Sequence, residues 1–379
     1  MKKTLDPLFK PFVSKKLTLK NRIVMSPMTR SFSIDGIPGE HVAQYYRRRA
    51  EHEVGLIITE GTVVNDPASA GHPNNPRFYG DDALNAWAHV VKEVHEAGGK
   101  IFPQIWHVGM VRAAVDDMFT VTDKSTLPNP EAPAVGPSGI EVYRLEEEKG
   151  ETLTEERIQS IIAAFGQAGA DAKRLGFDGV EIHGANTYLI DQFFWEKTNK
   201  RTDKYGGDLV QRTRFAVEVI EAVRKAVGPD FPISFRLSQF KYGEHRSNLF
   251  NTPEELAMFI KPLSDAGVDI FHTATFRFYK PEFEGSDLNL AGWIKKLTGK
   301  PTISVGSVGL PLDLGMAAVE DTVEDNLDKL VQKIDDGEFD LIAVGRSLLS
   351  DPAWATKMRD GRRDEIIPFK GLESFATLS

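Results

Sequence analysis

Cysteine is absent from the chain of 379 residues, and this absence excludes several kinds of chemistry at once. Without thiols there is no disulfide, thiolate nucleophile, cysteine-ligated zinc or iron–sulfur cluster. Histidines four residues apart with a carboxylate base are missing too, so we expect no bound metal. Redox chemistry would therefore need an organic cofactor held without a covalent bond, or a site of histidines and carboxylates.

Long apolar runs and an excess of positive charge are missing as well. No run approaches the roughly 18 to 20 residues that span a bilayer, and the charged start at residues 1–7 does not match a signal peptide. A net charge of −9 disfavours nucleic acid, and Arg47, Arg48 and Arg49, followed by Glu51, are typical of a solvated helix face. We expect a cytoplasmic protein without nucleic-acid or membrane partners.

Apolar, β-branched segments alternate with amphipathic helical segments along the whole chain. This pattern predicts repeated βα units and a parallel sheet. The eight predicted strands cover residues 23–28, 56–60, 101–106, 180–184, 233–238, 270–273, 302–306 and 341–346. The clearest helix is predicted from Thr154 to Leu175, with Gly176 ending it. Eight such units indicate an α/β fold of the (β/α)₈ TIM-barrel type, whose active site lies at the carboxyl ends of the strands.

Three additions to the barrel are expected. Residues 9–13 and 17–19 predict an N-terminal hairpin that closes the barrel floor. Residues of about 107–153, rich in proline and longer than ordinary βα loops, predict a capping insertion after strand 3. Aromatic segments at 239–252 and 276–286 are candidate lids. Because no linker divides the sequence, we expect residues 1–379 to form a single domain.

The fourth strand ends in the most informative segment, where His183, Asn186 and Tyr188 follow one another closely. An imidazole and a carboxamide can hydrogen-bond one substrate oxygen, and a phenol nearby can deliver a proton. Placed at the mouth of a barrel, these three side chains are predicted to be catalytic.

Glycine turns follow the last two predicted strands, at Gly306-Ser307 and Gly345-Arg346. Barrels often bind phosphate at this place, where glycine exposes backbone amides and an arginine supplies charge. The alternative is two ordinary turns with Arg346 in a surface salt bridge.

Gln104 and Arg236 are predicted to project from strands 3 and 5, where an unpartnered polar group is costly. A flavin would supply partners for both, since its pyrimidine edge suits a carboxamide and its reduced form, anionic near N1, suits a guanidinium. Alternatively Arg236 forms a buried ion pair with Glu181. Thr29 could donate to a cofactor carbonyl or merely cap a turn, and His107 is expected to be structural.

With these residues in place, the chain resembles the Old Yellow Enzyme family of FMN-dependent ene-reductases, including 12-oxophytodienoate reductases, over nearly its full length. The motifs that carry the resemblance are many and in order along the chain. They are Leu8–Pro11, Leu19–Arg30, Thr59–Thr62, Gln104–His107, His183–Asn186, Asp191–Phe194, Asn199–Gly207 and Val344–Arg346.

The resemblance implies non-covalent FMN, with NADPH or NADH as the electron donor. It places the flavin against Pro27, Met28, Thr29, Gly61, Gln104 and Arg236, and its phosphate against Gly306, Ser307, Gly345 and Arg346. His183 and Asn186 would bind the substrate carbonyl oxygen, and Tyr188 would protonate Cα. Trp106, His72 and Phe369 would line the substrate pocket.

The implied substrates are activated alkenes such as enones, nitroalkenes and maleimides, with quinones or nitroesters as further acceptors, and the implied state is a monomer or homodimer. Relatives that extend this barrel with a cysteine-ligated cluster are excluded by the absence of cysteine. From other classes, Glu60 and Glu181 could be the paired carboxylates of a glycosidase, and an FMN-storing protein without catalysis is the binding-module alternative.

Overall fold

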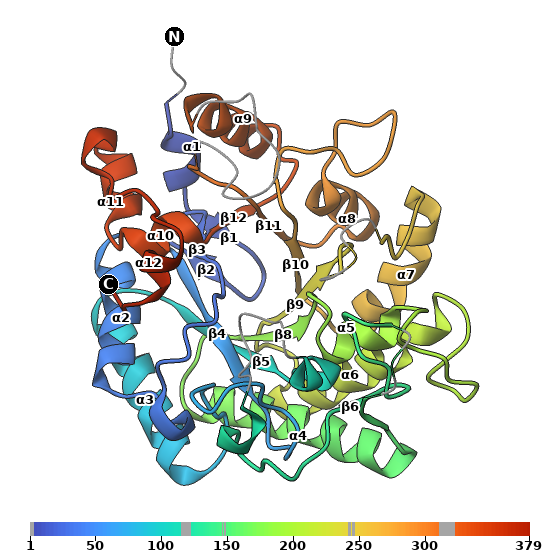
Figure 1. The fold of residues 1–379 in the computed structure, drawn as a ribbon. Helices are drawn as coiled ribbons and strands as arrows, with labels where there is room; N and C mark the ends of the chain where they lie inside the picture. The colour runs from blue at the N-terminus through green and yellow to red at the C-terminus, as the bar shows by residue number, and fades with distance from the viewer. Residues whose placement is uncertain are drawn as a thin grey trace.

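Eight parallel strands form a closed barrel at the centre of the molecule (Figure 1). The computed structural model describes residues 4–114, 123–145, 147, 149–241, 244, 247–310 and 323–379. Around the barrel the strands follow chain order, and every neighbouring pair is parallel. They are β3 (Ile23–Met25), β4 (Leu56–Val63), β5 (Ile101–Trp106), β8 (Val180–Gly184), β9 (Ile233–Ser238), β10 (Ile270–Ala274), β11 (Thr302–Val305) and β12 (Leu341–Val344).

All eight predicted strands are confirmed, and β11 ends one residue earlier than the sequence indicated. Two strands end earlier by more than one residue: β3 ends at Met25 and β12 at Val344. Pro27 has no N–H to donate to a ladder, and Gly345 has a backbone outside the strand region. The residues after both strands therefore lie in turns at the mouth of the barrel, where they can face a ligand.

Helices surround the barrel (Figure 1). The longest, α4 (Glu155–Arg174), begins as predicted, because the Thr154 hydroxyl accepts the N–H of Arg157, and Gly176 follows its end with a φ of +86°. The other helices are α1 (Asp6–Phe9), α2 (Glu40–Glu51), α3 (Asp81–Glu96), α5 (Leu189–Phe194), α6 (Arg214–Val227), α7 (Pro253–Asp265), α8 (Leu290–Thr298), α9 (Val323–Asp335), α10 (Arg346–Ser350), α11 (Trp354–Arg359) and α12 (Leu372–Phe375), with short 3₁₀ turns η1 (Ile34–Gly36), η4 (Gln211–Thr213) and η5 (Arg363–Glu365).

The predicted hairpin closes the floor of the barrel. Its strands β1 (Phe12–Val13) and β2 (Thr18–Leu19) pair antiparallel. Phe12, Leu17 and Leu19 are buried, and they share one apolar cluster with residues of the barrel strands. The members from the strands are Val24, Leu56, Ile58, Phe102, Ile270, Ile303, Val305, Leu341 and Ala343. Apolar burial of this kind stabilises the fold without supplying any reactive group.

The described part of the cap, between β5 and α4, contains η2 (Gly109–Ala113), η3 (Lys124–Thr126), β6 (Val135–Gly136) and β7 (Glu151–Thr152). Met110, Val111 and Val142 from this segment pack in one cluster with Trp106 and Tyr188. The cap therefore covers the side of the site that carries Tyr188, as the proline-rich sequence predicts.

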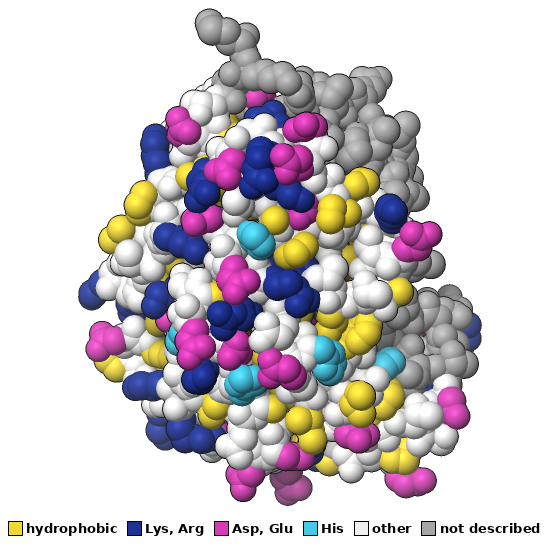
Figure 2. All heavy atoms as spheres, turned by 90° about the vertical axis from the view of Figure 1, so that its left-hand side faces the viewer, with side chains coloured by type: hydrophobic (Ala, Val, Ile, Leu, Met, Phe, Trp, Pro, Cys, Tyr) yellow, Lys and Arg dark blue, Asp and Glu magenta, His cyan; other side chains and the backbone are white. Residues whose placement is uncertain are grey.

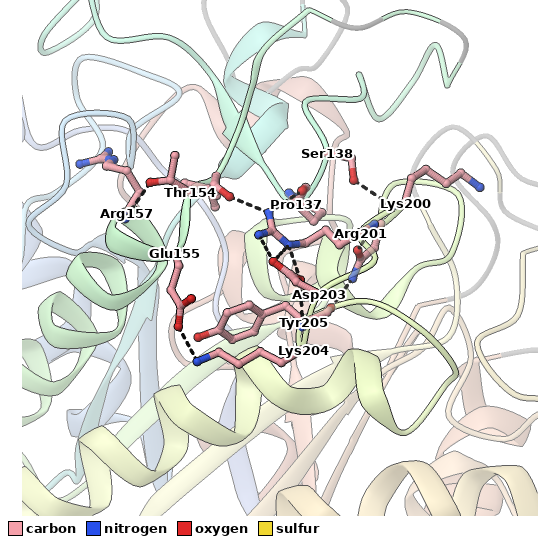
Figure 3. Close-up of polar contacts among 12 residues, drawn as sticks. Pro137, Ser138, Thr154, Glu155, Arg157, Lys200, Arg201, Asp203, Lys204 and Tyr205 are labelled. Atoms are coloured by element: carbon pink, nitrogen blue, oxygen red, sulfur yellow. Dashed lines mark hydrogen bonds and ion pairs between the residues drawn. The ribbon is translucent and has the colours of Figure 1, made fainter.

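Arg201 fastens the cap to the segment that follows α5 (Figure 3). Its guanidinium donates to the carbonyl oxygens of Pro137 and Leu153, at 3.0 and 2.6 Å, and pairs with Asp203. Ser138 adds a bond by accepting the N–H of Lys200. The motif at 199–207 thus has a structural part in this fold.

The surface that carries α2 and α3 has acidic and basic side chains interspersed (Figure 2). Among the helices that the structure describes, none is long and apolar enough to cross a membrane.

Candidate active site

A cavity of about 280 Å³ opens at the carboxyl ends of the barrel strands. Most of the residues proposed from the sequence line it together. These are Pro27, Met28, Thr29, Gln104, His183, Asn186, Tyr188, Arg236, Gly306, Ser307, Gly345 and Arg346. Its volume lies near the lower end of the usual range for ligand pockets, about 300–1,000 Å³. The barrel therefore brings the predicted polar groups to one place.

His183, at the end of β8, is set up to donate a hydrogen bond into the cavity. Burial lowers its pKa well below the usual value, and the nearby charge of Arg236 acts in the same direction, so the imidazole is neutral. Its Nδ1 accepts the N–H of Ala185 at 3.3 Å. Since a neutral imidazole carries one N–H, the proton must be on Nε2, which can donate to a substrate oxygen.

Asn186 and Tyr188 stand in the turn after β8. Asn186 has a φ of +59°, and Thr187 beside it has +65°, so this turn has a backbone conformation that non-glycine residues rarely adopt. Among the described residues, the side-chain amide oxygen of Asn186 is buried and lacks a hydrogen-bond partner. Such an unpartnered acceptor in a cavity wall indicates a position for a ligand.

Tyr188 is almost fully buried and is held by two rings. Its ring packs edge-on against Trp106, with centroids 4.7 Å apart, and against His183 at 4.9 Å. Trp106 also stacks on His183 at 6.2 Å. Trp106 therefore positions the two predicted catalytic rings from behind and is not itself among the residues that line the cavity.

Gly61 has a different role from the flavin contact that the family resemblance implies. A Cβ at this position would lie 2.4 Å from the Trp106 ring. β4 also shifts its register against β5 between Ile58 and Gly61. Gly61 is therefore needed for the packing of Trp106, and it does not line the cavity.

Gln104 and Arg236 belong to a buried polar network below the cavity. Glu181 accepts hydrogen bonds from Gln104 at 2.9 Å, Ser234 at 2.8 Å and His272 at 2.8 Å. Burial acts to raise the pKa of Glu181, but His272 and Arg236 outweigh it and keep the pKa below the usual value. Glu181 is thus an anion that supports Gln104 directly and Arg236 through its charge.

The two glycine turns also line the cavity. Gly306 has a φ of +132°, and a Cβ there would lie 2.6 Å from the Thr275 carbonyl oxygen, so only glycine fits. The Ser307 hydroxyl donates to the carbonyl of Phe276 at 2.8 Å. Gly345 and Arg346 face the same space from the start of α10. Glycine backbone, a hydroxyl and a guanidinium are suitable groups for binding a phosphate.

Thr29 lines the cavity from the loop after β3, next to a buried carboxylate. Glu60 accepts the backbone N–H groups of Arg30 and Ser31, at 2.8 and 3.0 Å. Burial raises the pKa of Glu60 to about 7 despite these two bonds. Glu60 therefore fixes the loop that presents Thr29 and contributes no group to the cavity.

This placement argues against the glycosidase alternative, because neither Glu60 nor Glu181 lines the cavity. Both carboxylates are buried and already accept several hydrogen bonds. His107 is structural as expected: its Nε2 lies 3.2 Å from Asp66, and its Nδ1 accepts the N–H of Gly109.

Like Trp106, two further residues expected in the substrate pocket do not line the cavity. His72 is absent from the cavity lining, and its Nδ1 accepts the N–H of Asn74. Phe369 packs under the Arg346 guanidinium, 5.9 Å from it, and against Phe375. Phe375, from the C-terminal helix α12, takes the lining position instead.

Phe240 and Phe276 line the cavity, and they belong to the two aromatic segments expected from the sequence as candidate lids. Their rings pack together with centroids 4.3 Å apart. They follow β9 and β10 directly, so the rule that placed His183 at a strand end could have found them. We call this pair the aromatic wall.

Comparison with known proteins agrees with this site. Residues 7–365 match the model of the NADH:flavin oxidoreductase / NADH oxidase family. The chain is 35% identical to an NADH oxidase of Thermoanaerobacter brockii, over 92% of this chain and 50% of that protein. It is 33% identical to 12-oxophytodienoate reductase 7 of Oryza sativa subsp. japonica, over 93% of this chain and 88% of that protein.

Among solved structures, morphinone reductase superposes with a TM-score of 0.76 and 27% identity, covering 97% of this chain and 92% of that one. The family match over residues 7–365 and the shared barrel identify a flavin-dependent oxidoreductase. The chain belongs to the Old Yellow Enzyme family within the NADH:flavin oxidoreductases, whose cofactor is FMN. It spans about half the length of the NADH oxidase.

The residues present fit FMN. Thr29, Gln104 and Arg236 offer the hydroxyl, amide and cationic donors that an isoalloxazine edge requires. The turns at Gly306 and Gly345 line the same cavity. One continuous cavity therefore offers suitable partners for both the ring and the phosphate.

Proposed function

We propose that this protein is an FMN-dependent ene-reductase that reduces α,β-unsaturated carbonyl or nitro compounds with NADH or NADPH. When bound, FMN would accept a hydride from the nicotinamide and deliver it to Cβ of the alkene. The observation that carries the proposal is the convergence of His183, Asn186 and Tyr188 on the cavity that also contains the flavin donors.

His183 and Asn186 would hold the oxygen of the substrate. The neutral His183 donates from Nε2, and Asn186 can donate from its amide. As hydride arrives at Cβ, negative charge develops on this oxygen, and preorganised donors stabilise it more strongly than they stabilise the ground state. A carbonyl or nitro group conjugated with the alkene is therefore required.

Tyr188 would deliver the proton to Cα. Its ring is held in place by Trp106 and His183, and its side chain lines the cavity. Hydride at Cβ and a proton at Cα together convert the C=C bond into a saturated one, with NAD(P)⁺ as the other product. The names of two relatives, which denote reductases of 12-oxophytodienoate and morphinone, support an oxo compound as the substrate class.

The experiment is an anaerobic measurement of the two half-reactions. Purified protein should be yellow, should be bleached by NADH or NADPH, and should be reoxidised by 2-cyclohexenone with formation of cyclohexanone. Protein that remains colourless after reconstitution with FMN would overturn the proposal. So would reduced protein that no enone, maleimide or nitroalkene reoxidises.

A further inference from the structure

A fully enclosed pair of a lysine and a carboxylate lies directly behind the turn that carries Asn186 and Thr187. The Lys241 ammonium pairs with the Asp191 carboxylate, and both side chains have 0% exposure. Burial raises the pKa of Asp191 and lowers that of Lys241, so both charges are costly at this place. Buried pairs often stabilise less than apolar side chains of similar volume, which suggests a role other than stability.

Asp191 holds the strained turn of β8. Its second carboxylate oxygen accepts the N–H of Thr187 at 2.7 Å. Gln192, the next residue of α5, donates to the carbonyl oxygen of Thr187, also at 2.7 Å. Because Thr187 is β-branched and has a φ of +65°, its conformation persists only where surrounding groups enforce it. Asn186, the preceding residue, takes its direction from this turn.

Lys241 comes from another part of the chain, the segment after β9. It directly follows Phe240, which forms the aromatic wall of the cavity with Phe276. Ser238 makes a second connection in the same direction, because its hydroxyl accepts the N–H of Asn186 at 2.9 Å and donates to the Phe240 carbonyl at 3.2 Å. The ion pair and Ser238 therefore tie the amide that faces the substrate to the aromatic wall.

We propose that Lys241 and Asp191 are positioning residues that fix the distance between Asn186 and the aromatic wall, and that they thereby select flat, conjugated acceptors. This inference rests on the proposed function, because it assigns Asn186 to the substrate oxygen. A planar enone or phenol can lie between the Asn186 amide and the rings of Phe240 and Phe276. A substrate with a bulky substituent out of this plane would meet the fixed wall.

The test compares Asp191→Leu, Lys241→Met and the double variant Asp191→Leu/Lys241→Met, each loaded with FMN. A single change leaves one buried charge without its partner and should lower the melting temperature markedly. The double change places two apolar side chains in the same volume and should regain most of that loss. In the double variant the Thr187 N–H has no carboxylate to accept it, so the turn that carries Asn186 should no longer be held in its conformation.

The affinity for a para-substituted phenol is measured from the absorbance change of the flavin. It reports on the part of the cavity around Asn186 and does not require turnover. We expect at least tenfold weaker phenol binding in all three variants, including the double variant with restored melting temperature. The ratio of kcat/KM for 2-cyclohexenone over 4,4-dimethyl-2-cyclohexenone, whose methyl groups project above and below the enone plane, should fall in the double variant. Lys197→Met is the matched control. It removes the exposed pair between Lys197 and Glu244, which lies on the same segment as Lys241, and it should change neither the phenol affinity nor the kcat/KM ratio.

Recovery of both the melting temperature and the phenol affinity in the double variant would overturn the inference, because the pair would then be only structural. Unchanged phenol affinity in the single variants would overturn it as well. Wild-type protein that binds FMN but neither binds phenol nor reduces any enone would instead overturn the proposed function. The two failures are thus distinguishable.

Discussion

The two ends of the barrel are closed by different kinds of residue. At the floor, Phe12 and Leu19 of the hairpin seal the strands with an apolar cluster. At the mouth, Glu181 and Arg236 place buried charges beside the cavity, and the loops above carry strained backbone. The apolar cluster at the floor stabilises the fold, whereas the buried charges and the strained backbone at the mouth cost stability and serve the site. Substitutions at the two ends should therefore separate stability from activity.

The largest effect is expected at the mouth, from Tyr188→Phe. Loss of the proton donor should slow reduction of 2-cyclohexenone by about 10²- to 10⁴-fold. The melting temperature and the rate of flavin reduction by NADH should stay near the wild-type values, because the ring and its packing remain. Stopped-flow measurement of both half-reactions checks this, and equal slowing of the two would remove Tyr188 from the donor role.

The matching change at the floor is Leu19→Ala. A buried leucine truncated in a packed cluster costs about 2–5 kcal/mol of unfolding free energy, measurable by urea denaturation. The folded fraction should keep its FMN, phenol affinity and turnover. Val13→Ala on the same hairpin is the control, since Val13 is 70% exposed and should change stability by less than about 0.5 kcal/mol. A loss of turnover in folded Leu19→Ala would contradict the separation of the two ends.

A smaller effect is expected where the cap joins the mouth, at Asp66. Burial would raise its pKa, but His107, the N–H of Ala68 and Arg157 outweigh burial and lower the pKa to about 2. Because the folded pKa is below the unfolded one, this carboxylate stabilises the fold above about pH 4, and the contribution is lost as the pH falls toward 2.

Asp66→Asn should therefore cost about 2 kcal/mol at pH 7, and the difference from wild type should shrink toward pH 2. Urea denaturation at several pH values measures this. A difference that stays constant across that interval would show that the ionised form of Asp66 is not what holds the cap.

The smallest effect is expected on the surface, at Lys204→Ala. Lys204 pairs with Glu155 at 2.6 Å on the exterior near the cap (Figure 3), with side chains 47% and 63% exposed. Exposed pairs contribute about 0–1 kcal/mol, so neither stability nor turnover should change appreciably. A loss comparable to that of Leu19→Ala would mean that the cap depends on this pair and that stability is not concentrated at the floor.

The sequence was sufficient for the barrel and for most of the site. Parallel barrel strands are buried on both faces, so they appear as continuous apolar segments, and the rule that sites lie at their carboxyl ends located His183 and Arg236. The two aromatic segments expected as lids contain Phe240 and Phe276, but these residues were not identified individually, because aromatic residues in a loop have no periodicity that separates lining from packing.

Contacts between distant parts of the chain could not be predicted. Phe375 reaches the cavity because Arg30 donates to the carbonyl oxygens of Phe375 and Thr377, at 3.1 and 2.7 Å. Arg49 was expected on a solvated face, but it is fully buried and donates to the carbonyl of Leu348 at 2.8 Å. Neither contact follows from a local sequence pattern, because the partners are separated by 345 and 299 residues along the chain.

The most direct test of the proposed chemistry is the position of deuterium in the product. Reduction of 2-cyclohexenone with NADH in D₂O should place deuterium at Cα, where the proton arrives, and hydrogen at Cβ, where the hydride of NADH arrives. Nuclear magnetic resonance of the cyclohexanone distinguishes the two carbons. Deuterium mainly at Cβ, or no saturated ketone at all, would contradict a site in which Tyr188 protonates Cα and the nicotinamide supplies the hydride.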